Sequence, residues 1–240
     1  MSLIFNSDPS KIVQNALIHA CSTNKNIYKL KNYNVLISKS KSVVESNSDF
    51  AILSGGGAGH EPFAAGFVGK GGLNCAISGE IFTSPSVTSI YAGLEALINL
   101  EKKTRILVLI INYTGDRINF GQAVEKIKVN YPKIEIDLFS VADDKSLDNL
   151  QPRGLTAALT CVKLANGMFN SGLSLEDVVS ELNLLNFGTV GCSVSSSSSL
   201  SVSKVNFEGF MELGLGIHGE PGVERIDLPK DDKLSFMVER

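Results

Sequence analysis

Two of the three histidines in the sequence lie in glycine-rich segments, where a small molecule can reach an imidazole easily. His60 follows residues 55–59, and His218 lies within residues 214–222, a segment of four further glycines and a proline. Glycine lets the backbone approach a ligand closely, so His218 is placed to act as a nucleophile on a small substrate. A turn histidine without a chemical role fits the same pattern equally well when this segment is taken alone.

Asp116 is the third candidate, and it ends the segment Asn112-Tyr113-Thr114-Gly115-Asp116. An aspartate after a glycine turn is a common helix cap, and it is also a suitable general base for a hydroxyl group. The spacing alone leaves both interpretations open. The glycine segment before His60 could cradle an anion, but it lacks the glycine spacing of the P-loop and dinucleotide patterns, so a plain tight turn remains its alternative.

Strands and helices alternate along the sequence, and this alternation positions the candidates. Apolar runs and alternating patterns predict strands at 35–37, 50–54, 75–77, 106–111, 134–141 and 211–217. Helical spacing and capping patterns predict helices starting at Asp8-Pro9, at Ser84-Pro85 and after Asp116, and two more over 155–169 and 175–184. The sequence therefore predicts an α/β fold with a largely parallel or mixed sheet and helices on both faces.

Several glycine-rich or polar segments directly follow predicted strands, at 55–62, 112–116 and 142–144. Ligands of open α/β sheets bind at the carboxyl ends of the strands. We therefore expect residues 55–62, 112–116 and 214–222 to converge on one pocket that contains His60, Asp116 and His218. The third histidine, His19, lies off the apolar stripe of its helix and is interpreted as a surface residue.

The composition restricts the class of protein. A net charge of −3 gives no basic footprint for nucleic acid, and no apolar run is long enough to cross a membrane. The four cysteines are scattered without metal-type pairing, so we expect no metal site and a cytoplasmic location. The Ser-rich run 193–203 predicts a linker, which divides the chain into an α/β half at 1–192 and an incomplete second half at 193–240.

Ordered motifs along the sequence resemble the dihydroxyacetone kinase family. They are Leu53 to Pro62, Ala65 to Gly71, Ile81 to Ser86, Asn112 to Asp116 with Asn119-Phe120-Gly121, and Gly214 to Gly219. These motifs occur in the family's order over roughly 220 residues, which makes chance agreement implausible. The resemblance is to the substrate-binding subunit or domain of that family, including its eukaryotic triokinase and FMN cyclase branch, cut off before the domain ends.

The resemblance implies a function for each candidate residue. In the family, a histidine matching His218 holds dihydroxyacetone or glyceraldehyde as a covalent hemiaminal. A histidine matching His60 hydrogen-bonds the bound substrate, and an aspartate matching Asp116 accepts the proton of the hydroxyl that is phosphorylated. The backbone at Gly57, Ala58 and Gly59 would line the sugar.

The resemblance also implies partners that lie outside these residues. The phosphoryl donor would be ATP with Mg²⁺ on a helical domain, or a separate nucleotide-bearing subunit, and any flavin cyclase activity would depend on that domain. No cofactor is expected in this chain itself, and a homodimer is expected from the family. The alternative is a dihydroxyacetone-binding regulatory or coactivator module without kinase activity.

The sequence departs from the family pattern at a few positions. A substrate-contacting lysine of the family is Ile111 here, and a Gly-Thr pair is Ala157-Ala158. The family's Gly-Asp-Asp is Ala142-Asp143-Asp144, and its Arg-Arg-Gly is Pro152-Arg153-Gly154. The nucleophile and both proton-handling residues are kept while one polar contact is lost, which predicts weaker affinity or an altered substrate.

Overall fold

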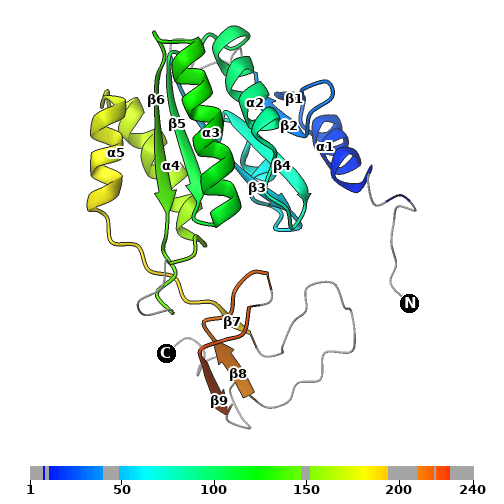
Figure 1. The fold of residues 1–240 in the computed structure, drawn as a ribbon, viewed down its shortest axis with the longest axis vertical. Helices are drawn as coiled ribbons and strands as arrows, with labels where there is room; N and C mark the ends of the chain where they lie inside the picture. The colour runs from blue at the N-terminus through cyan, green and yellow to red at the C-terminus, as the bar shows by residue number, and fades with distance from the viewer. Residues whose placement is uncertain are drawn as a thin grey trace.

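The computed structural model describes residues 8, 11–39, 49–146, 152–193, 210–218 and 220–227. Its elements in chain order are α1 (Ile12–Thr23), β1 (Ile27–Lys29), β2 (Val35–Ser38), β3 (Phe50–Ala58), the 3₁₀ helix η2 (Ala65–Phe67), β4 (Cys75–Ile81), α2 (Val87–Asn99), β5 (Arg105–Ile111), α3 (Thr114–Asn130), β6 (Glu135–Val141), α4 (Ala157–Asn170), α5 (Leu175–Leu184), β7 (Cys192–Ser193), β8 (Phe210–Leu213) and β9 (Glu224–Asp227). Strands and helices alternate, which confirms the predicted α/β class (Figure 1).

The described strands form two sheets. The larger is a mixed sheet in the order β1-β2-β4-β3-β5-β6, in which β4, β3, β5 and β6 are parallel and β2 pairs antiparallel with both β1 and β4. The smaller is the antiparallel sheet β7-β8-β9. The arrowheads of β5 and β6 point toward the small sheet, so the small sheet lies beyond the carboxyl edge of the large one (Figure 1).

Helices cover both faces of the large sheet, because its central strands are apolar on both sides. On β5, Leu107 and Leu109 belong to the core shared with α1, α4 and α5. The alternate residues Ile106 and Val108 belong to the core shared with α2 and α3. A strand buried on both faces is held rigidly, which fixes the positions of the loops at its carboxyl end.

The glycines before His60 are part of a strand, whereas the sequence predicted a loop from residue 55. A Cβ on Gly55 would lie 2.2 Å from the carbonyl oxygen of Ile77, and one on Gly57 would lie 2.8 Å from the amide nitrogen of Thr83. Glycine therefore lets β3 continue to Ala58 in close contact with β4 and the segment after it. The turn comes only at Gly59, where φ is +101°.

Three predicted helix starts are corrected. The first helix begins at Ile12 with Lys11 as its cap, and Pro9 lies outside the described residues. The second is capped by Ser86, whose hydroxyl accepts the amide of Ser89, because the preceding residues 83–85 run against Gly79 instead. The third begins at Thr114, so Asp116 lies inside its first turn and makes no cap. The capping box at Ser174 is confirmed.

The strand predicted over 211–217 ends at Leu213, because Gly214 takes φ +76° and turns the chain. His218 therefore lies in the loop between β8 and β9 and does not extend directly from a strand end. The serines from residue 194 and the helix start expected at Asp231 lie outside the described residues. Within the described part of the chain, no helix has the length and apolar character needed to span a membrane.

Candidate functional site

His60 is held in one tautomer by its own loop. Its Nδ1 lies 3.1 Å from the carbonyl oxygen of Gly57, and a carbonyl can only accept, so Nδ1 carries the proton. The Nε2 atom of the neutral ring is then an acceptor. It is buried and has no hydrogen-bond partner among the described residues. A buried acceptor without a partner is costly, and a ligand hydroxyl at this position would satisfy it.

Asp116 presents a buried carboxylate to the same space. Its residue is only 5% exposed, and its Oδ1 likewise lacks a partner in the described part of the chain. Burial raises the pKa of Asp116 from 3.8 to about 6, although a hydrogen bond from Ser84 and the nearby His60 both act to lower that pKa. The first turn of a helix also favours a carboxylate. The group is thus ionised at neutral pH yet basic enough to accept a proton.

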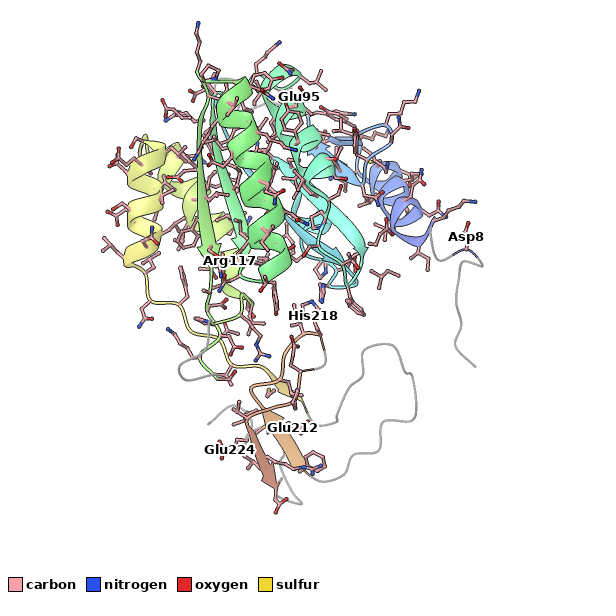
Figure 2. The ribbon with its side chains drawn as sticks, viewed as in Figure 1. Asp8, Glu95, Arg117, Glu212, His218 and Glu224 are labelled. Carbon is pink, nitrogen blue, oxygen red and sulfur yellow. The ribbon has the colours of Figure 1, made fainter. Side chains whose placement is uncertain are left out.

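His218 completes the cluster from the loop between β8 and β9. Its ring centroid lies 4.8 Å from that of His60 and 4.7 Å from that of Tyr113, both in edge-to-face contact. Figure 2 shows His218 extending from the small sheet toward the large one. Its side chain is 32% exposed, so a ligand can still reach the ring.

Glu220 orients His218 through two atoms. The backbone amide of His218 donates to Oε2 of Glu220 at 3.0 Å, and Nδ1 of the ring lies 3.5 Å from Oε1. A carboxylate beside Nδ1 favours the tautomer with the proton on that nitrogen. The free lone pair of His218 is then on Nε2.

Arg153 fastens this loop to the large sheet. Its Nη2 lies 2.6 Å from Oδ2 of the fully buried Asp144 and donates to the carbonyl of Gly214 at 2.9 Å. Its Nη1 lies 3.9 Å from Oε2 of Glu220. Burial alone would raise the pKa of Asp144, but hydrogen bonds from Ser146 and Arg153 outweigh it and hold that pKa below its usual value.

The neighbouring Asp143 secures the start of α4 on the other side of the site. Its carboxylate accepts the backbone amides of Leu155 at 2.6 Å and Ala157 at 2.9 Å. The first amides of a helix otherwise lack partners, so this carboxylate fixes where α4 begins. The adjacent residues 154–156 thereby form a wall of the site.

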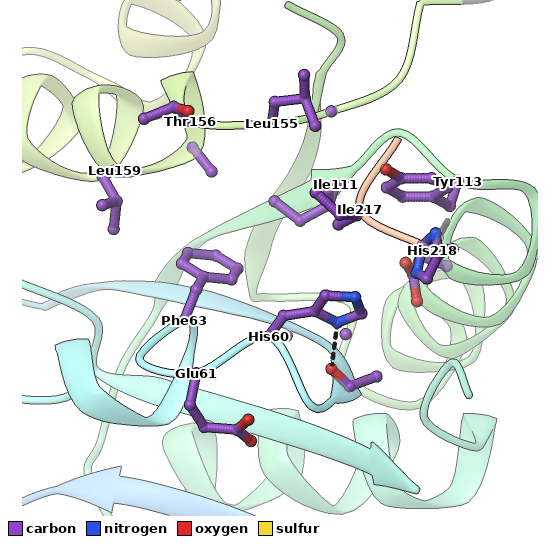
Figure 3. Close-up of a pocket in the computed structure, with 16 residues that line it drawn as sticks. His60, Glu61, Phe63, Ile111, Tyr113, Leu155, Thr156, Leu159, Ile217 and His218 are labelled. Carbon is purple, nitrogen blue, oxygen red and sulfur yellow. Dashed lines mark hydrogen bonds between the residues drawn. The ribbon is translucent and has the colours of Figure 1, made fainter. Parts of the chain in front are cut away.

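These residues surround one cavity of about 330 Å³ (Figure 3). It is lined by Gly55, Gly56, Gly57, His60, Glu61, Phe63, Ile111, Tyr113, Asp116, Gly154, Leu155, Thr156, Ala158, Leu159, Ile217 and His218. The structure therefore brings together His60, Asp116, His218 and Gly57, as the sequence predicted for the three segments. Ala58 and Gly59 do not line it: Ala58 is buried in the core, and the amide of Gly59 donates to Glu61.

Sequence reasoning did not single out Tyr113, Glu220 or Phe82. The hydroxyl of Tyr113 is buried at the site without a partner among the described residues, and burial raises its pKa above the usual value. Phe82 packs against the His60 ring at 5.1 Å. A second hollow of about 270 Å³ adjoins the cavity and is also lined by Asp116, His218 and Tyr113. Among the described residues, no group of three or more His, Cys, Asp or Glu could hold a metal ion.

Comparison with known sequences identifies relatives that match most of this chain. The chain is 41% identical over 192 residues to human "Triokinase/FMN cyclase", covering 77% of this chain and 33% of that protein. It is 44% identical over 197 residues to tomato (Solanum lycopersicum) "Putative 3,4-dihydroxy-2-butanone kinase", covering 78% and 32%. The chain thus spans about a third of the length of these relatives.

Solved structures agree with the fold. The dihydroxyacetone kinase of C. freundii in complex with AMP-PNP and Mg²⁺ superposes with a TM-score of 0.80 at 30% identity, over 100% of this chain and 45% of that one. The profile of the Dak1 domain matches residues 19–240. The extent of that match, together with the identity to the human relative, shows that the chain belongs to the Dak1 domain family of dihydroxyacetone kinases.

Proposed function

We propose that this chain is the part of a dihydroxyacetone or glyceraldehyde kinase that holds the triose. His218 captures the carbonyl carbon as a hemiaminal, and Asp116 accepts the proton of the terminal hydroxyl during phosphorylation. The observation that supports this most strongly is that one cavity brings a reachable imidazole together with three buried polar atoms, on His60, Tyr113 and Asp116, that have no hydrogen-bond partner among the described residues. The names of the human, tomato and C. freundii relatives agree with an enzyme of hydroxy-carbonyl compounds.

The capture step follows from the orientation of His218. Nε2 attacks the carbonyl carbon and forms a C–N bond, while the π electrons of the C=O bond move to the oxygen. The oxygen gains a proton and the imidazole loses the one on Nδ1, which lies beside Glu220. No oxidant or leaving group is required. Glycerol has no carbonyl, so it cannot be held in this way.

The transfer step depends on Asp116 and on a donor from elsewhere. A base with a pKa of about 6 can take the hydroxyl proton as the oxygen attacks the phosphoryl group. The second hollow, which shares Asp116 and His218, is the proposed side of donor approach. We propose ATP with Mg²⁺ on a further domain or subunit as donor, since the C. freundii kinase binds AMP-PNP and Mg²⁺.

Three further parts of the proposal concern organisation. The chain divides into halves at 1–192 and 193–240, with the nucleophile on the second half. It acts in the cytoplasm and pairs as a homodimer. A Listeria relative, 34% identical, is named as the dihydroxyacetone-binding subunit of a PTS-dependent kinase, which supports a partner subunit as an alternative source of the donor.

The test is intact-mass spectrometry of the chain after incubation with dihydroxyacetone. The expected product is a mass increase of one triose, absent with glycerol and absent in His218→Ala. His19→Ala is the matched control, because His19 is an exposed histidine on α1 far in sequence from the site. An adduct that persists in His218→Ala would refute the assignment of the nucleophile.

A regulatory module would need capture alone, so it predicts no use for a buried carboxylate of raised pKa. Phosphorylation measured with an added ATP-binding domain separates the two functions. A chain that captures dihydroxyacetone but never yields a phosphorylated product with any donor domain would support the regulatory alternative.

A further inference from the structure

The cavity has two chemically different ends. His60, Asp116 and His218 form the polar end, and the other end is lined mainly by the apolar side chains of Phe63, Ile111, Leu155, Ala158, Leu159 and Ile217, together with Thr156. In Figure 3, Phe63 and Leu159 lie on one side of the His60 ring and His218 lies on the other. Among the described residues that line the cavity, Glu61 carries the carboxylate near the apolar end, and it is turned back to accept the amide of Gly59.

A triose is too small to fill this space. It has three carbons and three oxygens. Even if each of these six atoms took up the volume of one water molecule in the liquid, about 30 Å³, the triose would occupy about half of the cavity. The cavity volume is about 330 Å³. The apolar wall that a triose leaves uncovered stays in contact with water, and covering it with an alkyl group would be favourable.

Apart from Thr156, the side chains named at the apolar end offer no hydrogen-bond partner to a second polar group. Ile111 is 8% exposed and Ala158 is 2% exposed, so both are fixed parts of the protein interior. They replace the lysine and the threonine of the family pattern. A hydroxyl placed against them would lose its water without gaining a partner, whereas an alkyl group would gain burial.

We propose that this site takes α-hydroxy ketones and aldehydes that carry a short alkyl arm on the carbonyl, opposite the hydroxyl that meets Asp116. The proposal rests on the proposed function of the polar end. The carbonyl lies at His218, the hydroxyl lies at Asp116, and the arm extends toward Leu159 and Phe63. The substrate class is thereby less polar than a triose.

The first experiment measures capture along a homologous series: hydroxyacetone, 1-hydroxybutan-2-one, 1-hydroxypentan-2-one and 1-hydroxyhexan-2-one. Burial of each methylene should lower the concentration for half-maximal adduct by about fourfold until the arm reaches the wall. Half-maximal concentrations that stay constant or rise with chain length would overturn the proposal.

The second experiment separates this proposal from the capture mechanism. The matching 1,2-diols cannot form a hemiaminal, yet their affinity by calorimetry should still rise with chain length. Absence of every adduct together with this rise would reject capture and keep the alkyl arm. Adduct with hydroxyacetone together with no rise in either series would keep capture and reject the arm.

The variant Leu159→Ser locates the arm. Leu159 is half-buried near the start of α4 and lines the cavity, so a hydroxyl there should abolish most of the gain per methylene. Leu164→Ser is the control, because Leu164 is a 36% exposed leucine of the same helix that does not line the cavity. A chain-length gain unchanged in Leu159→Ser and in the bulkier Leu159→Phe would place the arm elsewhere and contradict the proposal.

Discussion

Replacement of Asp116 by asparagine should stabilise the folded protein at high pH while abolishing most of its phosphorylation activity. Its pKa is raised from 3.8 to about 6, so ionising it in the folded protein costs about 3 kcal/mol relative to the unfolded chain. The folded protein binds more protons than the unfolded one between these values. The protonated carboxyl of Asp116 therefore contributes its full share of the folding stability below pH 4, and this share is lost as the pH rises through 6.

Asp116→Asn cannot ionise and should escape this loss. We compare the free energy of unfolding of the variant with that of the parent at each pH. This difference, variant minus parent, should be larger at pH 8 than at pH 4 by on the order of 3 kcal/mol. Urea unfolding at the two pH values measures this difference. Asp137→Asn, at an exposed aspartate on β6, is the control and should show little pH-dependent difference.

The same variant should still capture dihydroxyacetone but should lose phosphorylation by a factor of about 10²–10⁴ when a donor domain is supplied. The nearly unchanged shape of the side chain explains the first result, and the missing proton acceptor explains the second. A difference in unfolding free energy that is identical at pH 4 and pH 8, or turnover at the parental rate, would refute this account of Asp116.

Other replacements test the rest of the site. His218→Ala should abolish the triose adduct in intact-mass spectra and remove discrimination against glycerol; retained discrimination would point to another nucleophile. Ile111→Lys should tighten dihydroxyacetone binding about tenfold through a charged hydrogen bond, as titration of the adduct would measure; unchanged or weaker binding would contradict a substrate contact at this position. Glu220→Gln should slow adduct formation and alter its pH profile, because Nδ1 of His218 loses its charged partner; an unchanged profile would make Glu220 merely structural. Arg153→Met should cost about 3–5 kcal/mol in urea unfolding, because it leaves Asp144 buried without a counter-charge; a cost below 1 kcal/mol would contradict the role of this ion pair.

The central fold could be predicted because its signals are local. The apolar run that became β5 is buried on both faces, and the capping box at Ser174 begins α5 at the predicted residue. Strand length across glycines could not be predicted, because β3 continues to Ala58 only through close contact with β4. The three-residue strand β1 carries too few residues to show a period.

Three residues that line the candidate site could be predicted from the sequence, but the residues that hold them in place could not. Glycine segments and the family motifs identified His60, Asp116 and His218. The link from Asp144 through Arg153 to Glu220 joins residues that are far apart in the sequence and follow no period. Whether Asp116 was a cap or a base was undecidable from spacing, and it depended on the burial that tertiary packing gives the carboxylate.

The guanidinium of Arg153 has a consequence for the order in which the molecule becomes reactive. Gly57 in β3, His60 in the turn after it and Asp116 in the first turn of α3 belong to the large α/β layer, whereas His218 lies on the loop between β8 and β9. Under the proposed mechanism, His218 is positioned as the nucleophile only when Gly214 and Glu220 meet Arg153. We therefore expect an unfinished or half-opened chain to be inert toward the reactive aldehydes of the cell. Completing the fold is what makes it react.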